Sequence, residues 1–190
     1  MSTQSSSPVP TVPAARVAGT EAAQAFRRAM SRLAAPVVMV TTWLDGKPWG
    51  LTISACCSVS ADPPLFLISL ASNTVSTRTI REHGSFGVSI LGERLLPAAH
   101  HGSRQGAPKF VESFCEPGGG PDAARPPVVA GALAHLDCRL AQAVEAADHT
   151  LLIGAVEFVE VRGHDQPIVY YDRLYRVLAP TWPHDPVGNW

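Results

Sequence analysis

The sequence lacks an excess of either charge and has no long apolar run. Its 190 residues include 15 Lys and Arg against 16 Asp and Glu, a formal net charge of -1 at pH 7 with neutral histidines. We expect no nucleic-acid partner, because binding to phosphate backbones requires a basic surface. The longest apolar runs, such as 34–40 and 64–70, are much shorter than the ~20 residues that cross a bilayer. The N-terminus lacks the charged start and apolar stretch of a secretory signal, so we expect no membrane partner and a cytoplasmic location.

The sequence also lacks the common signatures of metal, disulfide and nucleotide sites. The cysteines include an adjacent pair and no C-x-x-C spacing, which argues against a disulfide framework and a zinc site. The neighbouring His100 and His101 have no carboxylate at an i+4 position, so we expect no metal site there. G-x-G-x-x-G after a strand, G-x-x-x-x-G-K-[ST], H-E-x-x-H and G-x-S-x-G are all missing, which excludes the ligand sites that those motifs build.

The composition favours one folded domain with irregular ends. Hydrophobic residues make up 46% of the chain and charged residues 16%, enough apolar surface for one core. Residues 1–19 carry Ser, Thr and Pro without any period, and we expect a disordered N-terminal arm. We place the domain at residues 20–180 and a C-terminal tail at 181–190. Apolar residues at three- and four-residue steps predict an amphipathic helix that begins at Thr20 and ends before Pro36.

Most of the remaining chain has the pattern of β-strands. We predict strands over 37–43, 49–54, 65–70, 86–91, 136–140, 150–161, 168–171 and 174–178. The turn Asp45-Gly46 predicts that the first two form a hairpin. Because few helices separate the strands, a closed antiparallel barrel with a few peripheral helices fits better than a parallel sheet.

Two short helices and a long loop complete the predicted domain. Ser72-Asn73-Thr74 is typical of a helix start, and we predict a helix from there to about His83 that ends at Gly84. The region 92–131 is the least regular, with a short helix near 93–101 and a Gly- and Pro-rich loop at 116–127. A loop of this length usually carries function or disorder.

Two hydroxyl-rich segments are candidates for ligand binding. Residues 50–60 combine small and hydroxyl side chains, which would let a flat ligand approach the backbone and meet convergent polar groups. The alternative is a strand whose Ser and Thr face water. Residues 72–76 lie at a helix start, where free N–H groups and the helix dipole favour a phosphate. Ordinary N-capping explains this second segment equally well.

The motifs taken together resemble the short-chain flavin reductases, the reductase partners of two-component flavin-dependent monooxygenases. In chain order they are Phe26-Arg27-Arg28-Ala29-Met30, Val38-Met39-Val40-Thr41-Thr42, Asp45-Gly46, Gly50-Leu51-Thr52-Ile53-Ser54, Ser58-Val59-Ser60-x-Asp62-Pro63-Pro64-Leu65, Gly84-x-Phe86-x-Val88, Gly131-Ala132-Leu133-Ala134-His135-Leu136-Asp137-Cys138 and Asp148-His149-Thr150-Leu151-x-Ile153-Gly154. The resemblance covers about residues 21–178. It implies a mainly β, antiparallel, Greek-key-like FMN-binding split β-barrel, a homodimer, and hydride transfer from NADH or NADPH to FMN or FAD. The reduced flavin would then pass to a separate monooxygenase.

The resemblance also assigns roles to individual residues. It places Thr52, Ile53, Ser54 and Ala55 at the flavin ring or its chain, Asp62 and Pro63 at the pocket wall, and Asn73, Thr74 and Ser76 at a phosphate. Asp148 and His149 match the segment beside the nicotinamide, where His149 is the candidate catalytic residue and a turn histidine is the alternative. That segment usually begins with Gly, whereas this chain has Ala147.

We make three further assignments and keep two alternative functions. Lys109 and Phe110 are expected to cover the nicotinamide, and Tyr171 is expected to contact the cofactor. The flavin and nicotinamide carry the chemistry of hydride transfer, so no nucleophile and base pair is required. The alternatives are a split-barrel enzyme that keeps its flavin and acts on another small molecule, and a flavin carrier or sensor without catalysis.

Overall fold

The computed structural model of the protein describes residues 20–117, 125–163 and 165–178. The predicted arm at 1–19 and the predicted tail at 181–190 lie outside the described residues. None of the described helices is long and apolar enough to span a bilayer.

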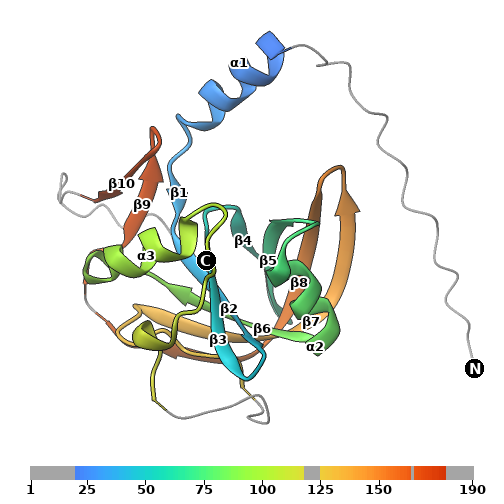
Figure 1. Ribbon diagram of the computed structural model, residues 1–190, viewed down its shortest axis with the longest axis vertical. Coiled ribbons are helices and arrows are strands. Elements are labelled where there is room, and N and C mark those ends of the chain that lie inside the picture. The colour runs from blue at the N-terminus through green and yellow to red at the C-terminus, as the bar shows by residue number, and fades with distance from the viewer. Residues whose placement is uncertain (1–19, 118–124, 164, 179–190) are drawn as a thin grey trace, which may run out of the picture.

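The described residues form a mainly β, antiparallel fold (Figure 1). One sheet has the strand order β3-β2-β6-β7-β8-β5-β4 and the other has the order β1-β9-β10. Their strands are β1 (Ala35–Pro36), β2 (Val38–Leu44), β3 (Lys47–Ile53), β4 (Cys56–Ala61), β5 (Pro64–Ala71), β6 (Ser85–Ile90), β7 (Ala134–Ala146), β8 (His149–Val161), β9 (Ile168–Tyr171) and β10 (Leu174–Val177). The predicted mainly β, antiparallel class with a few helices is confirmed.

Three α-helices and two short 3-10 turns accompany the sheets. They are α1 (Thr20–Met30), α2 (Val75–His83), η1 (Glu93–Leu95), α3 (Leu96–Ser103) and η2 (Glu112–Phe114). Figure 1 shows α1 standing away from the sheets, whereas α2 and α3 lie against them. No residue of α1 is buried, although its sequence is amphipathic.

Local residue chemistry sets several boundaries as predicted. Asp45 and Gly46 both have positive φ, 50° and 76°, in the turn between β2 and β3. Thr74 is the N-cap of α2, and its hydroxyl accepts a hydrogen bond from the Thr77 N–H at 3.2 Å. Gly84 ends the same helix in the left-handed conformation with φ 71°.

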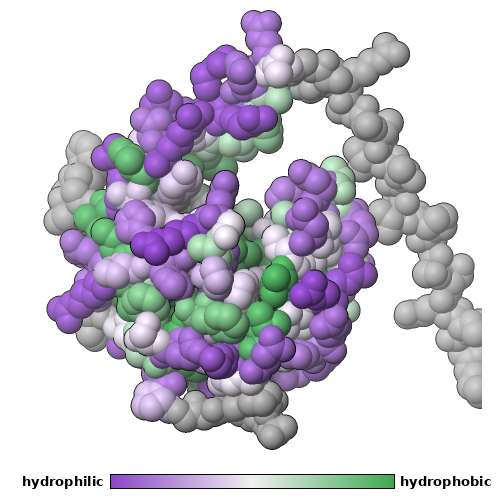
Figure 2. Space-filling model, viewed as in Figure 1, coloured by the Kyte–Doolittle hydropathy of each residue, from purple (hydrophilic) through white to green (hydrophobic). Residues whose placement is uncertain are grey.

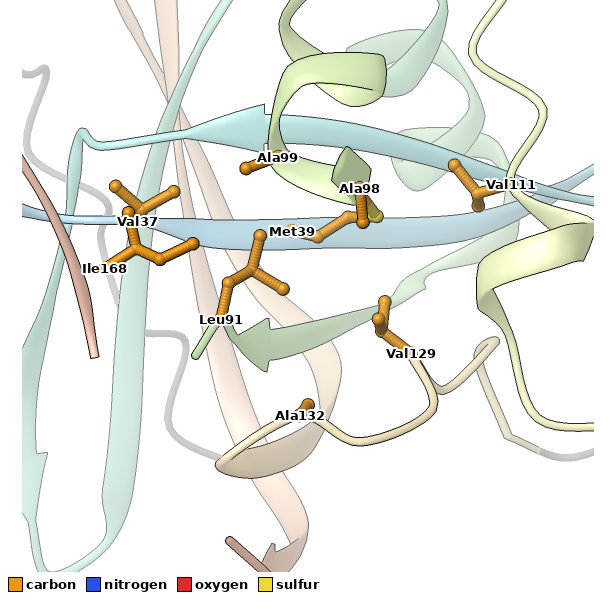
Figure 3. Close-up of a cluster of buried hydrophobic side chains, with 9 residues drawn as sticks. All are labelled: Val37, Met39, Leu91, Ala98, Ala99, Val111, Val129, Ala132 and Ile168. Atoms are coloured by element: carbon orange, nitrogen blue, oxygen red, sulfur yellow. The ribbon is translucent and has the colours of Figure 1, made fainter. Parts of the chain in front are cut away.

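The strand β2 is buried on both faces, which explains its continuous apolar sequence. Val37, just before the strand, and Met39 belong to the hydrophobic cluster that lies under α3, together with Leu91, Ala98, Ala99, Val111, Val129, Ala132 and Ile168 (Figure 3). Val38 and Val40 point to the opposite face and join a second cluster that includes Phe86 and Leu152. A strand covered by apolar groups on both sides does not alternate with polar residues.

A chain of buried polar side chains crosses the middle of the larger sheet. Ser89 Oγ and His135 Nδ1 share a hydrogen bond of 2.8 Å, and His135 Nε2 lies 2.9 Å from Asp137 Oδ1. Arg125 Nε donates to the other Asp137 oxygen at 2.5 Å. His135 is fully buried. Because each polar group has a partner, this network holds residues 125–129 against the sheet.

The stability of the fold is expected to fall as the pH is lowered below about 6.5. Burial lowers the pKa of His135 from the usual 6.5, and this effect outweighs the opposing hydrogen bond and charge of Asp137. Arg125 and Arg162 lower the pKa further. At acidic pH, His135 therefore binds a proton more readily in the unfolded chain than in the folded protein, and this favours unfolding. Urea unfolding from about pH 8 to about pH 5 will show the loss, and His135→Gln will flatten the dependence.

Candidate active site

The first candidate site is a hollow of about 460 Å³ between β3, α3 and the β9–β10 hairpin. Three of its lining residues, Thr52, Ile53 and Ser54, belong to the segment that is predicted to bind the flavin. The remaining lining residues come from other parts of the chain: Val37, His100, Ser103, Tyr170, Arg173, Leu174 and Tyr175. The hollow has a volume typical of small-molecule sites.

The close contact between β3 and α3 forms the floor of this hollow. A Cβ on Gly102 would lie only 2.4 Å from Thr52 Oγ1, so α3 approaches the strand as closely as a glycine permits. Among the described residues, Thr52 Oγ1 is buried and has no hydrogen-bond partner. Thr52 therefore lines the hollow while its hydroxyl is covered by α3.

The link between β3 and β4 lies at the edge of the first hollow. Ala55 is exposed, and its carbonyl accepts a hydrogen bond from the Ser69 N–H of β5 at 2.9 Å. Burial raises the pKa of the following Cys56 thiol to about 11, so this cysteine stays protonated near neutral pH. The link offers backbone groups and small side chains to a ligand, and no reactive thiolate.

Aromatic side chains form a wall of the hollow that the sequence prediction missed. The Tyr175 ring lies 5.0 Å from the His100 ring and 5.7 Å from the Tyr170 ring, both in edge-on arrangements. Tyr170 lines the hollow, but the predicted Tyr171 does not. Tyr171 lies beside Arg32 and raises the pKa of its guanidinium. Adjacent residues of a strand face opposite sides, so Tyr170 faces this hollow and Tyr171 does not. The predicted cofactor contact of Tyr171 stays a prediction.

The second candidate site is a hollow of about 500 Å³ at the start of α2. Asn73 and Thr74, which are predicted to bind a phosphate, line it along with Ser72, Thr77, Arg78, Arg81 and Glu82. Ser76 is buried instead, and its hydroxyl accepts a hydrogen bond from Trp49 Nε1 at 3.1 Å. Arg81 is paired with Glu145 at 2.5 Å, so the helix start and Arg78 are the groups that could provide N–H donors and positive charge to a phosphate.

Asp148 and His149 lie next to the second hollow, in the turn between β7 and β8. The Ser72 N–H donates to the Asp148 carbonyl at 2.9 Å, and His149 pairs with Ala71 of β5. His149 Nδ1 lies 2.7 Å from Asp148 Oδ1, and this hydrogen bond lowers the pKa of Asp148. Ala147 has φ 56°, so the turn takes the positive φ that a glycine would adopt easily.

The remaining predicted residues lie outside both hollows. The Lys109 carbonyl accepts a hydrogen bond from the Gly50 N–H at 2.9 Å, its ammonium group donates to the Arg104 carbonyl, and burial lowers its pKa. Phe110 packs edge-on against Trp49 with ring centres 5.1 Å apart. Asp62 and Pro63 form an exposed turn between β4 and β5 with a cis peptide bond. The roles predicted for these residues stay predictions.

Both hollows lie beside β3, but on opposite faces of this strand, because Trp49 faces α2 and Thr52 faces α3. Trp49 of this strand contacts Ser76 of α2, and Thr52 follows three residues later. At the usual rise per residue of a strand, Trp49 and Thr52 are roughly 10 Å apart. The hydroxyl-rich segments therefore line two separate hollows, one walled by aromatic rings and one at a helix start.

Comparisons with known proteins identify many relatives with this fold. Residues 30–179 match the family described as the flavin reductase-like domain. A flavin reductase (NADH) of Kitasatospora aureofaciens is 37% identical over 167 residues, which cover 83% of this chain and 81% of that protein. The reductase component of 4-hydroxyphenylacetate 3-monooxygenase from Thermus thermophilus is 33% identical over 160 residues, covering 84% and 98%. An NADH:FAD oxidoreductase of Streptomyces globisporus C-1027, solved with NAD and FAD fragments, superposes with a TM-score of 0.75 at 27% identity and covers 85% of this chain and 96% of its own.

Proposed function

The chain belongs to the flavin reductase-like domain family, and we propose that it is an NADH-dependent flavin reductase. It transfers hydride from NADH to FMN or FAD and supplies the reduced flavin to a separate monooxygenase. The match over residues 30–179 carries this conclusion. Support for a partner comes from the Thermus relative, which is the reductase component of a monooxygenase.

The first hollow fits a planar flavin ring. The Tyr170 and Tyr175 rings offer apolar contact area, and the backbone at Thr52, Ile53 and Ser54 is accessible beside small side chains. Ala55 follows at the exposed edge of the same strand. The second hollow fits the flavin phosphate, because Asn73 and Thr74 stand at the start of α2 beside Arg78.

The chemistry requires little from the protein beyond placement. The nicotinamide and the flavin supply the hydride donor and acceptor, so the protein needs no nucleophile and no strong base. Its residues must hold two planar rings face to face and keep water away from the faces in contact. His149 stays a predicted nicotinamide contact, and in the described chain it lies next to the second hollow, away from the first hollow to which we assign the flavin ring. The Asp148 carboxylate orients the imidazole at 2.7 Å and fixes which ring nitrogen faces the substrate.

A homodimer would explain the position of α1. The helix and the turn after it expose an apolar strip, with Phe26 of the helix and Leu33 of the turn each 62% exposed and Met30 46% exposed. Figure 2 shows apolar surface along the lower side of this otherwise polar helix. A second copy of the chain would remove this strip from water. Analytical ultracentrifugation should give twice the chain mass, and Phe26→Glu should shift it toward the monomer.

Steady-state kinetics test whether the flavin is a substrate. NADH oxidation should saturate with added free FMN or FAD, and protein purified without flavin should be fully active once flavin is added. Comparing NADH with NADPH will test the proposed dependence on NADH. A coloured complex whose activity is indifferent to added flavin would instead show an enzyme that keeps its flavin. The predicted cytoplasmic location stays a prediction.

A further inference from the structure

The turn between β9 and β10 places a cation at the rim of the first hollow in an unfavourable backbone conformation. Asp172 and Arg173 both have positive φ, 50° and 63°. Glycine or asparagine takes this conformation easily, whereas a long side chain does so at a cost. Arg173 lines the first hollow, but Asp172 does not. The Arg173 side chain is therefore held at the hollow by a turn that glycine would form with less strain.

The surroundings of Arg173 leave its guanidinium available. Among the described residues, Arg173 has no carboxylate within ion-pair distance, whereas Asp172 lies 3.8 Å from Arg32. The neighbouring lining groups are the aromatic rings of Tyr170, Tyr175 and His100. Flat aromatic walls suit the rings of a nucleotide, and a free guanidinium at the rim suits its phosphate. A guanidinium presents a fork of N–H donors that matches phosphate oxygens.

We propose that Arg173 binds a phosphate group of a nucleotide substrate at the rim of the first hollow. This proposal rests on the proposed function, because the flavin nucleotide and NADH are the two sources of such a phosphate. The residue would act on substrate affinity and selectivity, and would leave the hydride-transfer step unchanged. The second hollow is a separate site, because it lies at α2 and has its own arginines.

The test compares Arg173→Gly with the wild type for riboflavin, FMN, FAD and NADH. Glycine relieves the strained φ, so the variant should unfold at a temperature roughly 2 °C higher than the wild type. Its KM for the substrate whose phosphate is bound should rise about 10-fold, with kcat nearly unchanged. A rise for FMN and FAD but not for riboflavin places the flavin phosphate at Arg173 and overturns its assignment to the second hollow. A higher KM for FAD alone identifies the second phosphate of FAD. A higher KM for NADH, whichever flavin is the acceptor, identifies a phosphate of the dinucleotide.

Two further variants control for effects of the turn itself. Asp172→Gly relieves the same strain one residue earlier and removes only an exposed ion pair, so it should leave all four KM values unchanged. Arg173→Lys retains the charge and should recover part of the lost affinity. The proposal is overturned if Arg173→Gly leaves every KM unchanged, or if the KM for riboflavin rises as much as that for FMN. Wild-type protein that reduces no flavin at all would refute the proposed function instead.

Discussion

Gly102→Ala is expected to destabilise the protein and to disable the first hollow. The added Cβ would lie 2.4 Å from Thr52 Oγ1, 2.9 Å from the Thr52 backbone nitrogen and 3.1 Å from Met39 Cε. The hydroxyl and the Met39 side chain can move, but the Thr52 backbone is fixed by its pairing with Met39 of β2. The helix α3 must therefore move away from β3. Alanine favours helix by about 1 kcal/mol over glycine, but overpacking costs up to about 3 kcal/mol, so we expect a net loss of about 2 kcal/mol.

The loss should appear in both stability and kinetics. Because α3 carries His100 and Ser103 into the hollow, its displacement should lower kcat/KM for flavin at least 10-fold, roughly. Urea unfolding and steady-state NADH oxidation measure the two effects. Arg104→Ala, at the exposed end of α3, is the matched control and should change neither. Wild-type stability and kinetics in the Gly102→Ala protein would contradict the described contact.

Asp137→Ala should cause the largest loss of stability among single polar substitutions. Its carboxylate accepts from Arg125 at 2.5 Å and lies 2.9 Å from His135 Nε2, and only 10% of its side chain is exposed. Removing it leaves the buried His135 imidazole without this partner and releases Arg125 from the sheet. Together these losses should lower the free energy of unfolding by about 3 kcal/mol.

An exposed ion pair between β7 and the neighbouring β8 provides the comparison. Arg139 Nε lies 2.6 Å from Glu157 Oε1, but both side chains are more than half exposed. Glu157→Ala should therefore leave stability nearly unchanged, because solvent screens surface pairs. Denaturant unfolding of both variants at neutral pH measures the difference. Equal effects of the two substitutions would show that the buried network does not stabilise the fold.

Elements governed by neighbouring residues were predictable from the sequence. The Asp45-Gly46 turn, the N-cap at Thr74 and the glycine end at Gly84 each depend on residues within one turn of chain. These features set the first hairpin and α2 before any long-range contact is considered. The apolar runs of β2 and β5 also predicted strands, because they are buried in the core.

Strand features that depend on distant partners were not predictable. The strand β4 was missed because exposed residues, such as Ser58 and Val59, give it no apolar alternation. The strand β7 extends to Ala146, beyond the predicted end at residue 140, because it pairs with β8 along an exposed arm. Backbone hydrogen bonds hold such strands together, and they require no alternation of apolar and polar side chains in the sequence.

The candidate site also combines local features that the sequence predicts with distant contacts that it does not predict. Thr52, Ile53 and Ser54 share a hollow and Asn73 and Thr74 share another, as chain proximity within each segment suggests. The aromatic wall and Arg173 were missed because the β9–β10 hairpin reaches the hollow from the far end of the chain. The contact of Ser76 with Trp49 depends on how α2 packs against β3, which the sequence does not show, and the phosphate role of Ser76 stays a prediction.

The most direct test of the proposed function is anaerobic reduction of flavin. Purified protein mixed with NADH and excess FMN or FAD without oxygen should bleach the yellow absorbance over many turnovers. The rate should increase with enzyme concentration, and no bleaching should be seen on the same time scale without enzyme. Flavin that binds the protein but stays yellow in the presence of excess NADH would show a carrier or sensor without hydride transfer, and would contradict the account.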